Sequence, residues 1–267
     1  MNPLYRNDTA GEFPNSWYAA SAEIPPLRPA LRGETVADVC IVGAGYTGLS
    51  AARHLAAKGL DVVVLDAHRA GFGASGRNGG QVHSVFNAAQ SALEKRVGLD
   101  AAKKLWAFSE EAKADLRAIC QSEIPDARYT PGMAHGFYSS SEAQDHARDI
   151  DNLVDIYDYD QVQMLDAEAM HALVKSPLYQ GGLLDHGGGH IHPLRYALGL
   201  ARLAEDAGAR IYEMSEVHQL MHGDPATVRT NRGCVKANHV ILAGNGYLPN
   251  IARKVSAKVM PINSFIC

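Results

Sequence analysis

The feature that most constrains the fold is a strand, glycine turn, helix and strand in succession near residue 40. Residues 39–42 (VCIV) form a short, wholly apolar run, typical of a parallel strand that is buried on both faces. Residues 43–48 (GAGYTG) follow at once, and apolar residues then recur at helical spacing until Gly59. Residues 62–65 (VVVL) predict a second buried strand, with Asp66 at its carboxyl end. The segment therefore predicts a βαβ unit.

The turn has the pattern G-x-G-x-x-G, in which each glycine has a physical role. Gly43 permits the tight turn, Gly45 lets a pyrophosphate approach the backbone, and Gly48 allows close packing of helix and strand. Amides at the helix N-terminus, where Thr47 lies, then face the anion. A plain strand-helix turn is the alternative, but the flanking strands and Asp66 favour dinucleotide binding.

Asp66 narrows the choice of dinucleotide. Its carboxylate is expected to accept hydrogen bonds from ribose hydroxyls, and its charge repels a 2'-phosphate, which argues against NADP. A solvated strand end is the alternative interpretation. NAD and FAD fit this segment equally well.

The rest of the chain alternates between helical and strand-like segments. Residues 1–37 predict an extended arm, and residues 100–120 predict an amphipathic helix with Asp100 as its N-cap. Pro193 predicts the start of a second helix that ends at Gly208. Further strands are predicted at residues 136–138, 210–214, 217–221, 227–230, 235–237, 240–242 and, at the apolar end of the chain, 259–267.

A second glycine-dense loop, residues 71–81 (GFGASGRNGGQ), follows the second strand. This loop resembles the second flavin-contact loop of the D-amino-acid oxidase-like FAD-dependent oxidoreductases. Residues 16–21, 182–194 and 240–245 also resemble segments of that family, so the resemblance runs from Ser16 to about Cys267. A flexible, glycine-rich surface loop is the alternative.

The resemblance implies FAD as the cofactor and an α/β fold. A Rossmann-like FAD-binding domain, with a parallel sheet and a β-meander, is expected to be interleaved with a mainly antiparallel α+β substrate domain that is incomplete at the C-terminus. The expected order is an N-terminal arm (1–37), a first FAD-binding segment (38–85), a mostly substrate-binding segment (86–190), and a second FAD-binding segment with the start of a further substrate-domain strand (191–267). Besides the residues of the first turn and Asp66, the resemblance implies cofactor contacts at Ser75, Arg77, Asn78, Gly79, Gly80, Gln81, Val217, Ala243 and Gly244.

Two features depart from the family pattern. The family more often has Glu where this sequence has Asp66, a shorter acid that reaches one ribose hydroxyl or uses a water. Family members also continue well beyond 267 residues, so the chain is expected to stop within the fold.

The resemblance implies oxidation of a C–N bond in a small amine, gamma-glutamylputrescine or a similar compound. The imine product is expected to hydrolyse to an aldehyde and ammonia, with oxygen reoxidising the flavin and forming hydrogen peroxide. No catalytic residue is assigned. The alternatives are a truncated, catalytically silent FAD-binding fragment, a relative acting on another amine or amino acid, and an NAD-binding module, for which the loop at residues 71–81 is unnecessary.

Composition excludes several classes of protein. The net charge of -4 disfavours a nucleic-acid partner, and 46% apolar residues disfavour a disordered chain. No apolar run approaches the roughly 20 residues that span a bilayer, and residues 1–12 lack a signal-peptide pattern, so we expect no membrane association and a cytoplasmic location. The oligomeric state stays open.

Histidines and cysteines predict neither a metal site nor a disulfide. His186, His190 and His192 form the pattern H-x-x-x-H-x-H, but only Asp185 accompanies them as a potential acidic ligand, so we expect no metal. His192 is expected to cap the following helix or to lie beside the substrate pocket. The four cysteines are scattered and are interpreted as reduced thiols.

Overall fold

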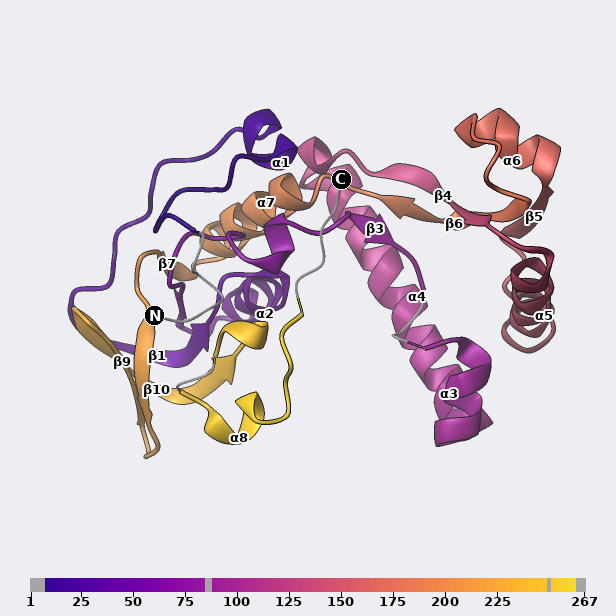
Figure 1. Cartoon of the computed structure of the whole chain (residues 1–267). Coiled ribbons are helices and arrows are strands. Elements are labelled where there is room, and N and C mark those ends of the chain that lie inside the picture. The colour runs from indigo at the N-terminus through magenta and orange to yellow at the C-terminus, as the bar shows by residue number, and fades with distance from the viewer. Residues whose placement is uncertain (1–7, 85–87, 249–250, 263–267) are drawn as a thin grey trace. The chain divides into compact units, whose positions relative to one another are not determined.

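A computed structural model describes residues 8–84, 88–248 and 251–262 of the chain (Figure 1). The chain divides into two compact units. Unit 1 comprises Met1–Gly79 and His192–Cys267, and unit 2 comprises Gly80–Ile191. Unit 2 is thus a continuous segment inserted into the sequence of unit 1.

Unit 1 is built on a six-stranded sheet with the order β7-β2-β1-β10-β9-β8. The first four of these strands are mutually parallel, whereas β10, β9 and β8 form an antiparallel meander. Their bounds are β1 Gly33–Val42, β2 Val62–Leu65, β7 Arg210–Tyr212, β8 Val217–Met221, β9 Ala226–Thr230 and β10 Gly233–Leu242.

The central strands of unit 1 are buried on both faces. All four residues of β2 are buried, because one face packs in a core cluster and the other is covered by helices. Cys40 and Val63 belong to that cluster together with Val228 of β9. Helices α2 (Tyr46–Ala57) and α7 (Pro193–Asp206) pack against each other and cover the sheet (Figure 1). Short helices α1 (Trp17–Ser21), η2 (Ala74–Gly76), η4 (Asn245–Tyr247) and α8 (Arg253–Ser256) complete the unit.

Unit 2 is built on a four-stranded antiparallel sheet whose central strand is β6 (Gly181–His190). Strand β6 pairs with β3 (Gln81–Val82), β4 (Thr130–Phe137) and β5 (Val162–Asp166). The helices of the unit are α3 (Gln90–Val97), α4 (Leu99–Ser122), η3 (Pro125–Ala127), α5 (Ser140–Tyr157) and α6 (Ala167–Val174).

Two tyrosine side chains pack against glycines of β6. An added Cβ on Gly187 would lie 2.3 Å from the Tyr159 hydroxyl, and one on Gly189 would lie 2.7 Å from the ring of Tyr129. The Tyr159 ring also packs edge-on against Trp106, with 5.2 Å between centroids. Tyrosine side chains therefore take up space that a side chain at Gly187 or Gly189 would need, and the Thr130 carbonyl adds to the exclusion at Gly189.

Several predicted elements are confirmed. Strands β2 and β8 have the predicted bounds, and α7 begins at Pro193. The His192 side chain caps α7 by accepting a hydrogen bond from the Arg195 amide at 3.2 Å. The mixed α/β class, with a parallel region in one sheet and a separate antiparallel sheet, is also confirmed.

Other predictions are wrong, each for a local reason. The arm contains a helical turn, α1, because the Ser16 hydroxyl caps it. Asp100 lies in the first turn of α4 and does not cap it, since Gly98, at φ 83°, is the N-cap. The separate strands predicted at residues 235–237 and 240–242 are one strand, β10. Residues 259–262 form no strand, and residues 263–267 lie outside the described residues.

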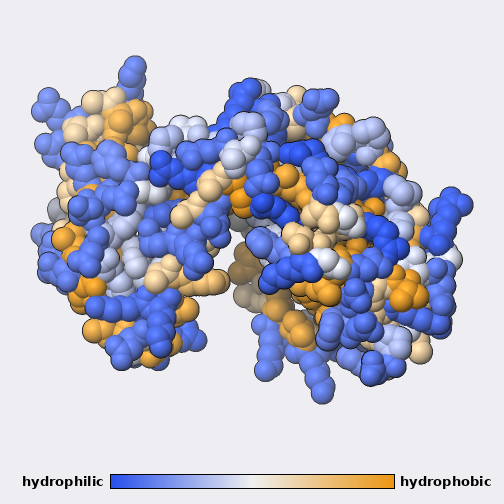
Figure 2. All heavy atoms as spheres, turned by 180° about the vertical axis from the view of Figure 1, so that it is seen from behind, coloured by the Kyte–Doolittle hydropathy of each residue, from blue (hydrophilic) through white to orange (hydrophobic). Residues whose placement is uncertain are grey.

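Figure 2 shows hydrophilic side chains over most of one face, with apolar ones in small groups. Among the helices that the structure describes, none is both long and apolar enough to cross a membrane. Cys40, Cys120 and Cys234 are free, while Cys267 falls outside the described residues.

Candidate dinucleotide-binding site

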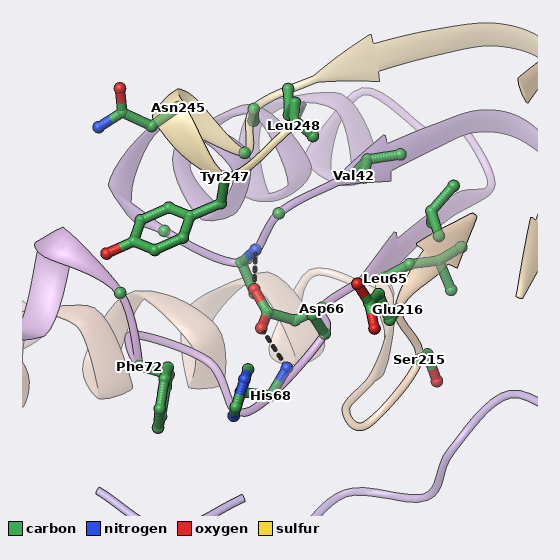
Figure 3. Close-up of a pocket in the computed structure, with 18 of the residues that line it drawn as sticks. Val42, Leu65, Asp66, His68, Phe72, Ser215, Glu216, Asn245, Tyr247 and Leu248 are labelled. Carbon is green, nitrogen blue, oxygen red and sulfur yellow. Dashed lines mark hydrogen bonds between the residues drawn. The ribbon is translucent and has the colours of Figure 1, made fainter. Parts of the chain in front are cut away.

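A cavity of about 360 Å³ opens in unit 1 at the carboxyl ends of β1, β2 and β10 (Figure 3). Open α/β sheets bind ligands at this edge, where strands give way to loops. Five stretches of chain line the cavity: residues 42–45, 65–68, 72–75, 215–218, and 243–251 without 246, 249 and 250. The site therefore collects segments that are far apart in the sequence.

The glycine turn after β1 lies close to the neighbouring backbone. Gly43 has φ +110°, and an added Cβ would lie 2.7 Å from the carbonyl oxygen of Ala243 at the end of β10. A Cβ on Gly48 would lie 1.9 Å from the Gly43 carbonyl oxygen. At Gly45 the obstacle would be the Ser75 hydroxyl at 2.8 Å. The turn thus leaves no room for a side chain at any of these three glycines.

Asp66 lies at the end of β2 with its carboxylate fixed by two amides. Oδ2 accepts a hydrogen bond from the Ala44 amide at 2.7 Å, and Oδ1 accepts one from the His68 amide at 2.8 Å (Figure 3). A carboxylate accepts about four hydrogen bonds, so each oxygen can still accept from a ligand hydroxyl. Burial raises the pKa of Asp66 to about 6; the two amides oppose this shift, and the nearby Glu213 charge adds to it.

His68 and Phe72 form a stacked pair on the cavity wall that was not predicted from the sequence. Their ring centroids are 3.9 Å apart and the planes differ by 9°. The His68 Nδ1 accepts a hydrogen bond from the Gly11 amide at 3.3 Å, which attaches the N-terminal segment to this wall. Burial lowers the pKa of His68 below its usual value. Nothing in the spacing of these residues distinguishes them from ordinary loop residues.

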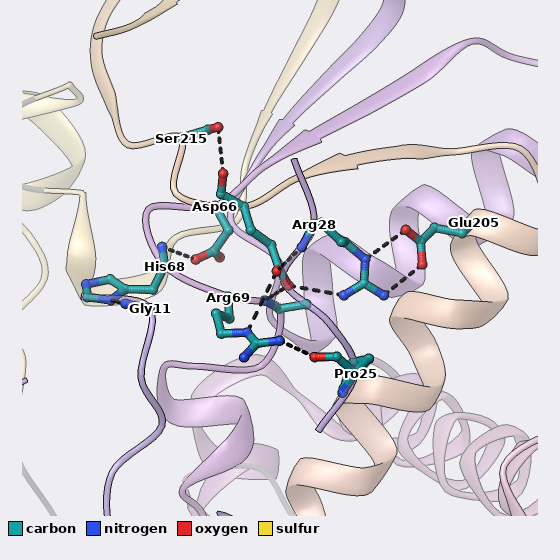
Figure 4. Close-up of polar contacts among 10 residues, drawn as sticks. Gly11, Pro25, Arg28, Asp66, His68, Arg69, Glu205 and Ser215 are labelled. Carbon is teal, nitrogen blue, oxygen red and sulfur yellow. Dashed lines mark hydrogen bonds and ion pairs between the residues drawn. The ribbon is translucent and has the colours of Figure 1, made fainter. Parts of the chain in front are cut away.

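A buried carboxylate, Glu213, secures the loop behind Asp66 (Figure 4). Glu213 is 1% exposed and accepts hydrogen bonds from the Arg28 amide at 2.8 Å and the Ala70 amide at 2.9 Å. The Arg28 guanidinium also donates to it at 3.1 Å, and Arg69 lies 3.8 Å away. Three segments of the chain therefore meet at one carboxylate, which explains how a loop carrying a ligand-facing Asp66 is held in place. Sequence spacing gives no signal for this role.

The predicted site residues separate into two groups. Seven line the cavity: Gly43, Gly45, Asp66, Ser75, Val217, Ala243 and Gly244. The other seven, all of them described residues, do not line it: Thr47, Gly48, Arg77, Asn78, Gly79, Gly80 and Gln81.

The second group has structural contacts of its own. Arg77 pairs with Asp8 at 3.0 Å, and the Asn78 amide group donates to the carbonyls of Ala74 and Ser75 at 3.1 and 3.0 Å. These contacts brace the loop that carries Ser75. Thr47 and Gly48 lie within α2, and Gly79 ends the first segment of unit 1, while Gly80 and Gln81 belong to unit 2, where β3 begins at Gln81.

The lining fits FAD on two structural observations. The turn at Gly43 and Gly45 lines the cavity without side chains and lies at the N-terminus of α2, which suits a pyrophosphate. The carboxylate of Asp66 keeps acceptor capacity beside that turn, which suits ribose hydroxyls.

Comparisons with known proteins agree with this arrangement. A family described as FAD dependent oxidoreductase matches residues 38–267. Gamma-glutamylputrescine oxidoreductase of Escherichia coli (strain K12) is 42% identical over 248 residues, which are 91% of this chain and 58% of that protein. Probable oxidoreductase OrdL of Rhizobium meliloti (strain 1021) is 35% identical over 252 residues, 94% of this chain and 59% of that protein. The chain therefore spans about three-fifths of the length of these curated relatives.

Solved structures share the fold. Glycine oxidase from Geobacillus kaustophilus superposes with a TM-score of 0.66 at 23% identity, covering 83% of this chain and 58% of that one. An L-amino acid deaminase from Proteus vulgaris, with its specific insertion sequence deleted, gives a TM-score of 0.68 at 19% identity, covering 87% of this chain and 58% of that one. The matched family is FAD-dependent, as the sequence predicted.

Proposed function

This chain belongs to the FAD-dependent oxidoreductase family, and from that premise we propose that it binds FAD in the cavity at the strand ends of unit 1. The observation that carries the proposal is the position of Asp66, whose carboxylate keeps acceptor capacity beside a turn that only glycine can form. Amides at the start of α2 hold the pyrophosphate, and Asp66 holds the ribose hydroxyls of the adenosine half.

The remaining lining residues complete the cradle in this proposal. Ser75 supports the turn, because its hydroxyl accepts a hydrogen bond from the Tyr46 amide at 3.0 Å. Val217 offers backbone groups toward the adenine, and Ala243 with Gly244 lets the cofactor pass close to the end of β10. Arg77, Asn78 and Gly79 act through the loop that they brace, while Gly80 and Gln81 begin unit 2.

For the whole protein we propose oxidation of a C–N bond in a small amine, with gamma-glutamylputrescine as the substrate. Bound FAD supplies the two-electron acceptor for this oxidation. The 42% identity to the Escherichia coli protein supports this substrate over the amino acids named for more distant structural relatives. Imine hydrolysis, peroxide formation and a cytoplasmic location are included in the same proposal.

The cofactor proposal is tested by titrating the purified chain with FAD and following flavin fluorescence and visible absorbance. Asp66→Asn keeps the side-chain shape but removes the charge and places an NH₂ group where an acceptor is needed. We expect the FAD dissociation constant to rise roughly 10- to 100-fold, the cost of losing hydrogen bonds to a charged acceptor. Asp206→Asn is the matched control, since Asp206 pairs with Arg202 on the surface of α7. Equal affinity of wild type and Asp66→Asn, with both folded by circular dichroism, would contradict the proposal.

The substrate proposal needs a separate assay on the full-length protein. Peroxide release with gamma-glutamylputrescine is the expected result. Turnover of sarcosine or a D-amino acid alone would refute this substrate and leave FAD binding intact. The silent-fragment alternative predicts that the 267-residue chain binds FAD but that substrate does not bleach it under anaerobic conditions.

A further inference from the structure

Unit 2 gathers three side chains that can ligate a metal, none of which lines the FAD cavity. They are His135 on β4 and Glu142 and His146 on α5, and their ligand atoms all lie within 4.8 Å of one another. The His135 Nε2 is 3.8 Å from the Glu142 Oε1. These three residues are called the His-Glu-His cluster below.

Hydrogen bonds at the start of α5 orient the Glu142 carboxylate toward the cluster. Ser139 caps α5 by accepting a hydrogen bond from the Glu142 amide at 3.2 Å, which fixes the first helical turn beside the end of β4. The Glu142 Oε2 accepts a hydrogen bond from the Tyr138 amide at 2.9 Å. The other oxygen, Oε1, faces His135. Carboxylates that ligate metals are oriented by such additional hydrogen bonds.

His146 follows Glu142 by one helical turn and therefore lies on the same face of α5. Its ring stacks on the buried ring of Phe137, with centroids 4.8 Å apart and planes differing by 11°. The ring centroid of His135 is 5.2 Å from that of His146. One imidazole is thus held by packing, whereas the side chain of His135 is 53% exposed, so an ion can reach the cluster from solvent.

Two imidazoles and one carboxylate form a ligand set that favours divalent transition metals over Mg²⁺. Zn²⁺ and similar divalent transition metals bind imidazole and carboxylate at about 2.0–2.2 Å, whereas Mg²⁺ demands oxygen ligands. Tetrahedral binding at these lengths places ligand atoms roughly 3.3 Å apart. Metal binding therefore draws together side chains whose ligand atoms already lie within 4.8 Å of one another.

We propose that the His-Glu-His cluster is a Zn²⁺-class metal site that links β4 to the first turns of α5. Three protein ligands leave a position for water or an exogenous ligand. This proposal departs from the sequence-based expectation of no metal site, which considered only the histidines near residue 190. The cluster escapes sequence inspection because His135 approaches Glu142 and His146 only when β4 and α5 pack together.

The test is equilibrium dialysis of the metal-stripped full chain against Zn²⁺ near pH 7.5, with bound metal counted by mass spectrometry. We expect one Zn²⁺ per chain at the cluster and a 10- to 100-fold loss of affinity in His146→Gln, His135→Gln and Glu142→Gln. Glu142→Gln is informative because the amide oxygen of Gln can still accept the Tyr138 hydrogen bond and keep the helix start intact. His186→Gln is the matched control, since His186 lies exposed on β6 and contacts Gln163 at 3.4 Å.

Two results would overturn the proposal. One is equal Zn²⁺ uptake by wild type and by the exposed-residue variant His135→Gln, which would leave His135 and Glu142 as a simple ion pair beside a capped helix. The other is loss of uptake in His186→Gln with no loss in the cluster variants. A rise in melting temperature with Zn²⁺ for wild type but not for His135→Gln supports the site independently, whereas Mg²⁺ at millimolar concentration should produce no such rise.

Discussion

Glycine positions in the two units exclude a side chain for different reasons. In unit 1 the nearest atoms that exclude a side chain at Gly43 and Gly48 belong to the backbone, namely the carbonyls of Ala243 and Gly43 itself. In unit 2 the nearest excluding atom at Gly187 belongs to a side chain, the hydroxyl of Tyr159. Gly43 and Gly48 therefore allow main chains to approach closely, whereas Gly187 makes room for an aromatic side chain.

This difference determines how well each position tolerates a substitution of its glycine. Backbone atoms in a buried parallel sheet cannot move without breaking hydrogen bonds, whereas a side chain can be shortened by a second substitution. Damage at Gly48 should therefore be irreparable by mutation of a neighbour, whereas damage at Gly187 should be reparable.

The largest effect is expected for Gly48→Ala. The new methyl group would lie 1.9 Å from the Gly43 carbonyl oxygen, so β1 and α2 must separate, at a cost of about 3 kcal/mol or more and with loss of FAD binding. Gly59→Ala is the control: its methyl group meets no atom, and the strain of φ +85° costs about 1 kcal/mol. Urea unfolding of both variants measures the difference. If both variants lose the same free energy of unfolding, then the steric contact at Gly48 costs no more than the backbone strain at Gly59.

The buried carboxyl of Asp66 is expected to make the stability of the FAD-free chain depend on pH. Burial raises its pKa from 3.8 to about 6, so the folded chain holds a proton that the unfolded chain has released between these values. The free energy of unfolding should therefore fall as pH rises from about 4 to 6, by up to about 3 kcal/mol.

Comparison with Asp66→Asn isolates the contribution of Asp66 to the pH dependence of stability, because the variant and wild type share all other titrating groups. His68 and His83, whose pKa values burial lowers, add stability with rising pH in both proteins. The wild-type profile should fall relative to that of Asp66→Asn across pH 4–6. If the two profiles of unfolding free energy against pH are parallel, burial does not raise the pKa of Asp66.

Gly187→Ala should destabilise unit 2 by about 2 kcal/mol, because its methyl group meets the Tyr159 hydroxyl at 2.3 Å. That hydroxyl donates to Asp185 at 2.6 Å and cannot swing away freely. Combining Gly187→Ala with Tyr159→Phe removes the nearest obstacle and leaves the Gln161 side-chain oxygen at 2.9 Å, so the double variant should be more stable than the sum of the two single costs predicts. Strict additivity in urea unfolding would refute the role given to Tyr159.

The smallest effect is expected at the helix starts. Helix α2 of unit 1 has Gly45 as its N-cap and takes no hydrogen bond from the cap side chain, whereas α6 of unit 2 is capped by Asp166, which accepts from the Ala169 amide at 2.8 Å. Asp166→Ala should cost about 1 kcal/mol, and Asp166→Ser should restore most of it. Melting temperatures of the two variants check this; identical values would show that the cap contributes nothing.

Local sequence signals predicted the fold wherever the structure depends on neighbours in the chain. The apolar run of β2 and the proline that begins α7 are such signals, and both are confirmed. The extension of β1 back to Gly33 escaped prediction because residues 33–36 are largely exposed and polar. They become strand only through pairing with β10, which lies 200 residues away at the pair Gly33 and Gly233.

The residues of the candidate site also divide into those that local sequence patterns predicted and those that depend on distant contacts. Gly43, Gly45 and Asp66 were found because dinucleotide chemistry demands them at fixed spacing after a strand, and the structure places all three on the cavity. His68 and Glu213 were missed because their importance comes from contacts with Gly11 and Arg28, which no local pattern encodes. Whether the predicted residues bind FAD stays a prediction that the titration of Asp66→Asn can test.

Because unit 2 is inserted within the sequence of unit 1, the two parts of unit 1 are synthesised at different times. Strand β1 leaves the ribosome long before its partner β10, and the 112 residues Gly80–Ile191 emerge between them. Those residues form a continuous segment with a sheet of its own and can assemble as soon as they are made, since domains fold as units during translation. The cavity at the strand ends of unit 1, which needs the end of β10, is therefore among the last regions of unit 1 to close. A ribosome that stalls before residue 242 releases a chain with an unpaired, apolar β1 edge exposed to aggregation.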